Sequence, residues 1–147
     1  MNMKILKILL LNSMILIVNG CNAQTDKDDK PILMLKDFYT AYSKVIFKFE
    51  DSSKVDSLLE KYCTPQLREK AKKYLEYGHD LLTDDWGFSE ESLTSLIVVK
   101  GAKENEYTVS YIVDTYPVAP NKPVKKQVVL FITVVKEGEN YKIDSIR

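Results

Sequence analysis

Residues 127–147 read QVVLFITVVKEGENYKIDSIR, and this stretch decides the fold class. Its first part, QVVLFITVV at 127–135, is apolar on both faces of an extended chain, which predicts a central strand. KEGEN at 136–140 has the composition of a turn, and NYKIDSI at 140–146 is predicted to return as a second strand. On the central strand, Val129 and Phe131 share one face, and we expect Phe131 to be buried. The other face is made by Val128, Leu130 and Ile132.

Two more strands are predicted upstream of this hairpin. SLIVVKGA at 95–102 and EYTVSYIVD at 106–114 are rich in β-branched and aromatic residues and alternate in polarity. In the second of these segments, Thr108, Ser110 and Asp114 share one face with the apolar Ile112. The opposite face carries Tyr107, Val109, Tyr111 and Val113.

The first half of the mature chain has helical periodicity instead. PILMLKDFYTAYSKVIFKFE at 31–50 repeats apolar residues every three or four positions, and DSSKVDSLLEKY at 51–62 does so over a shorter length. Thr64 and Pro65 suit the cap and first turn of a third helix, which Gly78 ends. Helices followed by four antiparallel strands predict an α+β fold, with N-terminal helices packed on a curved four-stranded sheet.

The first 20 residues read MNMKILKILLLNSMILIVNG and have the layout of a signal peptide. Lys4 and Lys7 are followed by an apolar run that is too short to cross a bilayer comfortably. Val18 and Gly20 then precede Cys21, and this order resembles the lipobox of bacterial lipoproteins. The resemblance implies cleavage after Gly20 and diacylation of Cys21, although Asn19 stands where the motif usually has a small residue. An ordinary signal with an incidental cysteine is the alternative.

The segment NAQTDKDDK at 22–30 is charged and polar, as expected of a solvated tether. Its acids resemble the segments that direct some Bacteroidetes lipoproteins to the cell surface. We therefore expect a signal peptide at 1–20, a tether at 21–30 and one domain at 31–147. The expected location is the cell envelope, as an outer-membrane lipoprotein on the periplasmic face or the cell surface, held to the membrane by lipid on Cys21.

Composition narrows the classes of partner. The chain has 21 basic and 21 acidic residues, and removing 1–20 leaves 19 and 21, a net charge of −2. No basic stripe is present to displace counterions, which argues against nucleic acid. Cys63 is the remaining thiol after Cys21, so no internal disulfide is predicted, and we expect Cys63 to be a small buried residue.

The order of elements is similar to the nuclear-transport-factor-2-like, or cystatin-like, cone. YCTPQL at 62–67 and VVKEGENYKIDSIR at 134–147 carry this resemblance, which extends to small Bacteroidetes lipoproteins of uncharacterised function. The resemblance implies a curved sheet whose concave face collects aromatic side chains, either as core or as a pocket. These would be Phe38, Tyr39, Tyr42, Phe47, Tyr74, Tyr107, Tyr111, Phe131 and Tyr141.

The segment YGHDLLTDDWGFSEES at 77–92 contains the only histidine, His79, and the only tryptophan, Trp86. Enzymes of the fold commonly pair an aspartate with a histidine or tyrosine, which draws attention to Asp80, Asp84 and Asp85. The same residues suit turns, and Ser89 with Ser92 suits the cap of a short helix. We assign no catalytic residue, metal or cofactor here, and take Trp86, Asp84 and Asp85 as candidate binding residues.

Two functions remain open from the sequence. The favoured one is a membrane-anchored binding module of the envelope, for example an immunity-type protein, whose curved sheet or DDWGF loop (84–88) meets a protein or small ligand. The alternative is a small cavity enzyme of the isomerase or hydrolase type that uses a buried carboxylate. A polar cavity containing buried Asp84 or Asp114 would favour the enzyme.

Replacing Cys21 by alanine tests the anchor. Cys21→Ala should abolish incorporation of labelled fatty acid and move the protein from the membrane to the soluble fraction, because one domain without acyl chains has nothing to hold it in a bilayer. Labelled fatty acid on the Cys21→Ala protein would contradict the lipoprotein assignment.

Overall fold

The computed structural model describes residues 29–47, 52–84, 88–115 and 122–147. Cys21, Asp85 and Trp86 lie outside the described residues, as does the predicted signal peptide. None of the described helices combines the length and apolar character needed to cross a membrane.

The helices begin and end close to the predicted residues. They are α2 (Lys30–Phe47), α3 (Ser52–Tyr62), α4 (Pro65–Glu76) and the short α5 (Glu90–Thr94). Thr64 caps α4, since its side-chain oxygen accepts a hydrogen bond from the backbone N–H of Leu67, and Pro65 occupies the first turn. Gly78 follows the helix with a φ of 76°, a left-handed conformation that costs glycine little.

Four strands form one antiparallel sheet in the order β1-β2-β3-β4. They are β1 (Ile97–Lys100), β2 (Glu106–Thr115), β3 (Val124–Glu137) and β4 (Asn140–Ile146). The α+β fold class is confirmed, and β3 is a central strand, as its apolar sequence predicts. Ser92, as predicted, accepts a hydrogen bond from the backbone N–H of Ser89 at the start of α5.

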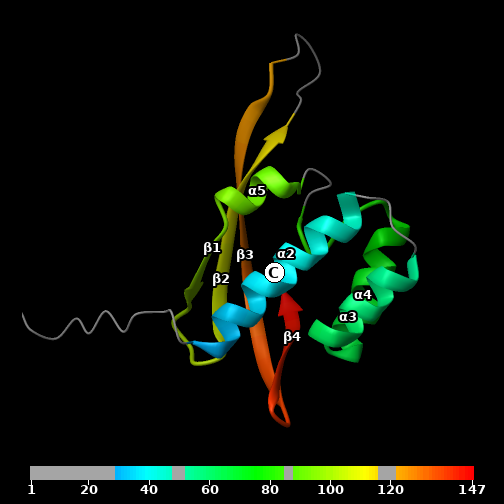
Figure 1. Cartoon of the computed structure of the whole chain (residues 1–147), viewed down its shortest axis with the longest axis vertical. Coiled ribbons are helices and arrows are strands. Elements are labelled where there is room, and N and C mark those ends of the chain that lie inside the picture. Colours follow the sequence, from blue (N-terminus) through cyan, green and yellow to red (C-terminus); the bar gives the residue numbers. More distant parts are fainter. Residues whose placement is uncertain (1–28, 48–51, 85–87, 116–121) are drawn as a thin grey trace, which may run out of the picture.

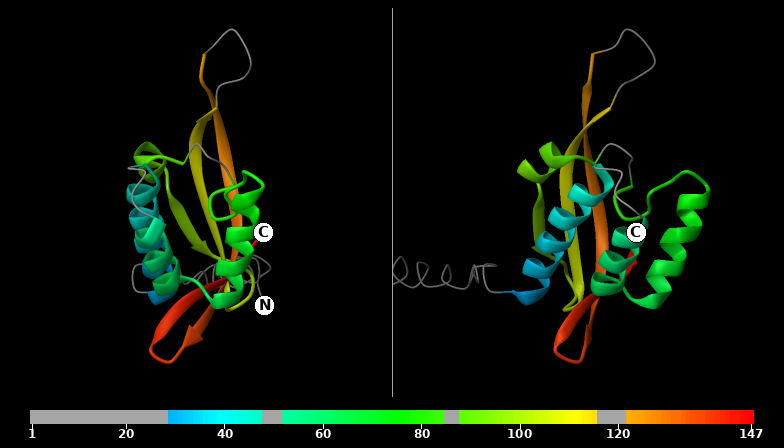
Figure 2. Two further views of the ribbon diagram at one scale, coloured as in Figure 1. Left: turned by 90° about the vertical axis from the view of Figure 1, so that its right-hand side faces the viewer. Right: turned by 45° about the vertical axis from the view of Figure 1, so that its right-hand side comes forward.

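The long helix α2 crosses one face of the sheet, and α3 and α4 pack near β4 (Figure 1). The corner between α3 and α4 is fixed to the last strand, because the backbone N–H of Thr64 donates to the carbonyl of Ile143 at 2.9 Å. At the far end, the β2–β3 hairpin projects beyond the helices (Figure 2). Its Val124, Lys125 and Lys126 are accordingly exposed.

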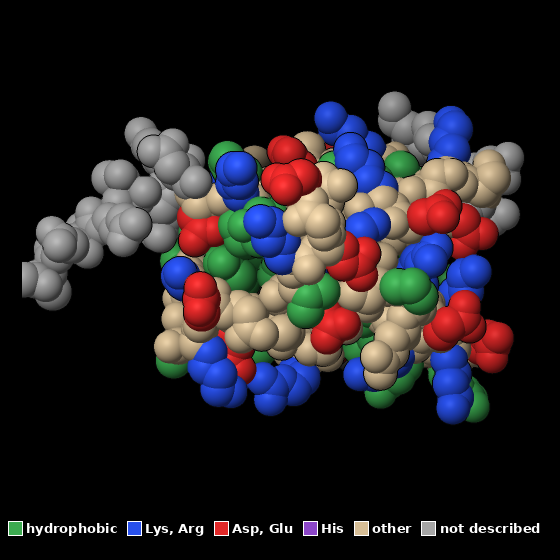
Figure 3. Space-filling view, turned by 90° about the horizontal axis from the view of Figure 1, so that it is seen from below, with side chains coloured by type: hydrophobic (Ala, Val, Ile, Leu, Met, Phe, Trp, Pro, Cys, Tyr) green, Lys and Arg blue, Asp and Glu red, His purple; other side chains and the backbone are tan. Residues whose placement is uncertain are grey.

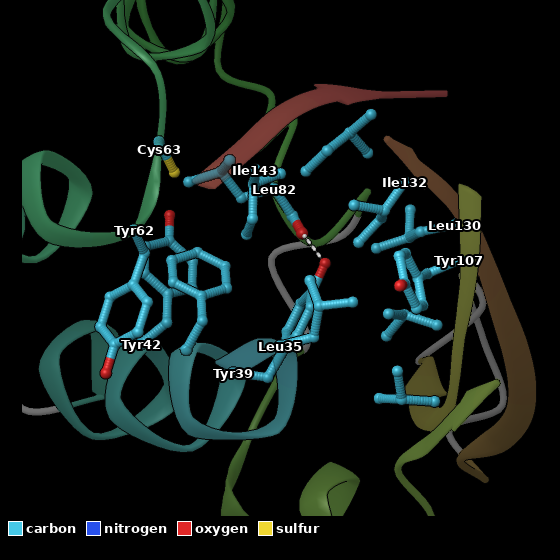
Figure 4. Close-up of a cluster of buried hydrophobic side chains, with 14 of the residues drawn as sticks. Leu35, Tyr39, Tyr42, Tyr62, Cys63, Leu82, Tyr107, Leu130, Ile132 and Ile143 are labelled. Atoms are coloured by element: carbon cyan, nitrogen blue, oxygen red, sulfur yellow. Dashed lines mark hydrogen bonds between the residues drawn. The ribbon is translucent and has the colours of Figure 1, made fainter. Parts of the chain in front are cut away.

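The core lies between α2 and the sheet (Figure 4). Phe38 of α2 contacts three rings, at centroid distances of 5.1 Å to Tyr39, 5.3 Å to Tyr42 and 5.6 Å to Tyr62. The sheet contributes alternate residues, as expected for a strand with one covered face. These are Val98, Tyr107, Val109, Tyr111, Val113, Val128, Leu130, Ile132, Val134, Ile143 and Ile146.

The expected burial of Phe131 is wrong. Phe131 is 55% exposed and Val129 is 43% exposed. On the other face of the strand, Leu130 is 2% exposed and Ile132 is 1% exposed. Both faces of β3 are apolar, and the helices cover only one of them. Tyr74, also expected in the core, is 39% exposed on α4. The side chain of Phe47 lies outside the described residues.

Alanine substitutions should separate the two faces of β3. Ile132→Ala removes a buried side chain and should cost about 2–5 kcal/mol of unfolding free energy. Phe131→Ala should cost about 1 kcal/mol or less, since it loses only exposed cross-strand contacts. Urea denaturation of both variants measures the difference, and equal destabilisation would show that the Phe131 face is also covered.

Candidate functional site

Among the described residues, the buried carboxylate is Asp80, and not Asp84 or Asp114, whose burial was expected to mark a cavity enzyme. Asp80 is 6% exposed. One carboxylate oxygen accepts from the backbone N–H of Leu82 at 2.9 Å and the other from the Thr83 hydroxyl at 2.8 Å. The Tyr42 hydroxyl donates to both oxygens at 3.2 Å. Burial raises the pKa of Asp80, and the hydrogen bonds from Thr83, Leu82 and Tyr42 partly oppose that rise.

Two further tyrosines hold the same loop. The Tyr39 hydroxyl donates to the carbonyl of Leu82 at 3.0 Å, a contact drawn in Figure 4. The Tyr111 hydroxyl, from β2, donates to the carbonyl of Thr83. Hydroxyl groups from α2 and β2 therefore converge on residues 80–83, which we call the clamped loop. Asp80 fixes the loop, and its hydrogen-bonding capacity is used within the protein.

The hydrogen bonds from Leu82 and Thr83 to Asp80 are of a kind that the sequence pattern predicts, although the pattern by itself indicates only a turn. Aspartate commonly accepts hydrogen bonds from backbone and hydroxyl groups two and three residues later, and Leu82 and Thr83 stand at those positions. The partners Tyr39, Tyr42 and Tyr111 are distant in sequence, so only the folded chain brings them to the loop.

His79 pairs with Asp84 and not with its neighbour Asp80. Its Nε2 lies 3.4 Å from a carboxylate oxygen of Asp84, and both side chains are partly exposed, at 40% and 54%. Asp84 adopts a φ of 51°, which aspartate tolerates better than most residues. Asp114 is exposed at the start of the projecting hairpin. Neither of the carboxylates named as marking a cavity enzyme is buried.

The histidine also borders an open hollow of about 620 Å³ at the end of α4. Lys70 and Lys73 come from one face of the helix, and the Lys70 ammonium lies 5.7 Å from the ring centre of Tyr74. Tyr77 and His79 complete the lining. The hollow is basic and aromatic, so the surroundings of Asp84 are less acidic than the sequence suggested.

The face of the sheet away from α2 carries a second candidate surface. Ile97, Val99, Ile112, Val129 and Phe131 are 41–57% exposed there, and we call them the apolar stripe. The strand register places them on one face, with Ser110 and Thr108 of β2 between the apolar residues of β1 and β3. Ile97 pairs with Ser110, which pairs with Val129, and Val99 pairs with Thr108, which pairs with Phe131. An exposed, contiguous group of large apolar side chains is typical of an interaction surface.

Charged residues stand at both ends of the apolar stripe. Near Phe131, whose backbone pairs with Arg147, Glu106 lies between Lys103 at 2.9 Å and Arg147 at 3.5 Å. At the other end, Asp114 pairs in register with Lys125 on the face of the stripe, and Lys126 points to the opposite face. The end near Phe131 therefore has two positive charges and one negative charge, and the other end has one of each sign.

Cys63 and the acidic residues give no reactive centre in the described part of the chain. Cys63 is 2% exposed, and burial raises its pKa to about 12, which keeps the thiol protonated. No group of three His, Cys, Asp or Glu side chains among the described residues is placed to hold a metal ion.

Variants of the clamped loop test its structural role. Tyr42→Phe removes a hydrogen bond to a carboxylate and should cost about 1.5–3 kcal/mol of unfolding free energy. Tyr74→Phe, on the exposed end of α4, is the matched control and should change it by no more than about 0.5 kcal/mol. Equal effects of the two changes would contradict the clamp.

The raised pKa of Asp80 also gives a pH dependence. Between the unfolded value of 3.8 and the raised folded value, the folded protein retains a proton on Asp80 that the unfolded chain has lost. The stability contributed by Asp80 therefore falls as pH rises through this window and is constant above it. The excess in unfolding free energy of wild type over Asp80→Asn should shrink from pH 3.5 towards neutrality. An excess that grows with pH would contradict the direction of the shift.

Comparisons with known proteins give a likeness of fold. A scan against models of known protein families finds none that matches, and a search of curated proteins finds no match. The structure is similar to the crystal structure of a protein of unknown function from Bacteroides thetaiotaomicron VPI-5482, with a TM-score of 0.69. The two chains are 26% identical, and the match covers 81% of this chain and 89% of that one. This likeness is consistent with an uncharacterised Bacteroidetes family.

Proposed function

We propose that this protein is a lipid-anchored binding module of the cell envelope, and that its apolar stripe docks a protein partner with an apolar centre and an acidic rim. Cys21 is the proposed lipid attachment site. The observation that carries the proposal is the apolar stripe itself, because five large apolar side chains are exposed together on one face of the sheet.

The shape of the surface favours a protein over a small ligand. The stripe spans β1, β2 and β3 on the open face of a sheet, and the hydroxyl groups of Thr108 and Ser110 lie among its apolar side chains. An open face of this kind offers broad contact, whereas small ligands are usually enclosed by concave pockets. Phe131 is the largest exposed side chain of the stripe, and aromatic residues are enriched at the cores of interfaces.

The charges at the ends of the stripe support an acidic rim on the partner. Lys103 and Arg147 outnumber the one nearby carboxylate, Glu106, at the Phe131 end, and Lys125 balances Asp114 at the other end. Complementary charge steers association and mainly accelerates it. The association rate of the partner should therefore fall as salt is added, because ions screen exposed charges.

Asp80 weighs against the cavity-enzyme alternative. A catalytic carboxylate needs a free oxygen that reaches substrate, whereas both oxygens of Asp80 accept hydrogen bonds from the clamped loop and Tyr42. The segment with Asp84, Asp85 and Trp86 remains a second candidate surface. On its two sides, Asp84 pairs with His79 and the buried Phe88 packs against the ring of Tyr111.

Serine substitution of Phe131 tests the docking surface. An envelope partner is first captured by the wild-type protein and identified, and its affinity is then measured with purified proteins. Phe131→Ser should weaken binding by about 2 kcal/mol, roughly 30-fold, with the melting temperature nearly unchanged. Leu75→Ser, which changes a 50%-exposed leucine on α4, is the matched control and should bind like wild type.

Two results would overturn this assignment. Unchanged affinity of the Phe131→Ser protein would move the interface elsewhere, first to the segment around Asp84 and Trp86. Sedimentation of the wild-type protein as a dimer that Phe131→Ser dissociates would assign the stripe to a second copy of this chain.

A further inference from the structure

A hollow of about 550 Å³ opens at the base of the domain, where the chain enters α2. Figure 3 shows this face, with hydrophobic side chains in a recess and charged side chains of both signs around it. Pro31 and Val134 are among its apolar lining residues. The volume lies within the range of small-ligand pockets, about 300–1,000 Å³.

The strand register shows how the floor is built. Lys100 on β1 pairs with Tyr107 on β2, and Lys136 on β3 pairs with Tyr141 on β4. All four side chains line the hollow, so it spans the sheet from β1 to β4. The two lysines are two strands apart, about 10 Å across the sheet. Lys136 also lies four residues, about 13 Å, further along β3 than Ile132, which is level with Lys100 through Tyr107. They therefore stand on opposite sides of a floor that contains two tyrosine rings.

The charged side chains around the hollow form no ion pairs within the described part of the chain. Lys30, Lys100 and Lys136 line it together with Asp29 and Glu104. None of these five forms an ion pair with another residue of the described part of the chain. Unpaired charges of both signs around one small hollow, with one more positive than negative, suit a ligand that itself carries both signs.

Tyr107 fixes one carboxylate at the floor. Its ring is 3% exposed, and its hydroxyl donates to an oxygen of Asp29 at 3.5 Å. Burial, with the nearby charge of Asp29, raises the pKa of Tyr107 to about 12, so the hydroxyl keeps its proton. Asp29 and the electron-rich ring of the partly exposed Tyr141 form a place for an ammonium group, since cations bind over aromatic rings. Lys100 and Lys136 are left for an anion.

We propose that this base pocket binds a zwitterionic aminoalkyl phosphate. The phosphate would be bound by the ammonium groups of the lysines, whose long side chains reach into the hollow from opposite sides, and the ligand's ammonium group would lie near Asp29 and the ring of Tyr141. Two kinds of molecule carry this group: a free aminoalkyl phosphate, and a phospholipid with such a headgroup, for example phosphatidylethanolamine.

The position of the pocket favours the lipid source if Cys21 is acylated. Seven residues lie between Cys21 and Asp29, and the eight steps from one to the other span at most about 29 Å. An acylated Cys21 would therefore keep the base pocket within that distance of the bilayer surface. The pocket itself is independent of the apolar stripe, so each assignment can fail without the other.

Calorimetry tests the pocket on the Cys21→Ala protein from the soluble fraction. Phosphoethanolamine should give saturable binding, and inorganic phosphate and ethanolamine alone should each bind at least tenfold more weakly. Lys100→Ala with Lys136→Ala should weaken phosphoethanolamine binding at least tenfold. The matched pair Lys70→Ala with Lys73→Ala, which removes the same charge from the α4 hollow, should change it less than twofold.

Vesicle flotation separates the two sources. Binding to phosphatidylethanolamine vesicles but not to phosphatidylglycerol vesicles, lost in the Lys100→Ala, Lys136→Ala protein, assigns the lipid headgroup. Binding of soluble phosphoethanolamine without vesicle binding assigns a free ligand. Inorganic phosphate that binds as tightly as phosphoethanolamine, or no saturable binding of phosphoethanolamine, overturns the proposal.

Discussion

The hydrogen bonds that hold residues 80–83 connect the two layers of this protein. The chain passes from α4 to α5 and the sheet through this loop, and hydroxyl groups from both α2 and β2 bind it. A buried carboxylate is stable only when its oxygens are satisfied, and Asp80 meets this requirement with backbone, threonine and tyrosine donors. The loop therefore cannot leave the core without exposing several buried polar groups at once. His79 and Asp84 at its ends are presented from a fixed base.

The one-sided covering of the sheet has the largest consequence for function. The helices α2, α3 and α4 pack against the core face, and the residues of the opposite face remain exposed. A four-stranded sheet needs only one buried face for stability, so apolar residues on the other face are not explained by folding. Five of them lie on this face, on β1, β2 and β3 around Thr108 and Ser110, and this explains why the proposed docking surface lies on the sheet and not at a buried acid.

The two proposed surfaces lie on different parts of the domain. The apolar stripe occupies the free face of β1, β2 and β3, whereas the base pocket lies on the core side where α2 begins. A protein anchored through Cys21 could hold its base near the bilayer and still offer the sheet to a partner. Their chemistry also differs. The stripe is apolar with charges at its ends, and the pocket is a small polar hollow on a tyrosine floor.

The sequence by itself determined the elements and their order. Thr64 and Pro65 start α4, Gly78 ends it, and the alternation in β2 separates Tyr107 and Tyr111 from Thr108 and Ser110, because caps and periodicity act between residues that are close in the chain. Only the tertiary structure decided which face of β3 is buried. That strand is apolar on both faces, so the local pattern does not predict whether Phe131 or Ile132 is buried. Ile132 is buried because α2 packs on its face of the sheet. The same holds for the candidate sites. Asp80 becomes buried, and Lys100 and Lys136 come to face one hollow, through contacts between residues that lie tens of positions apart.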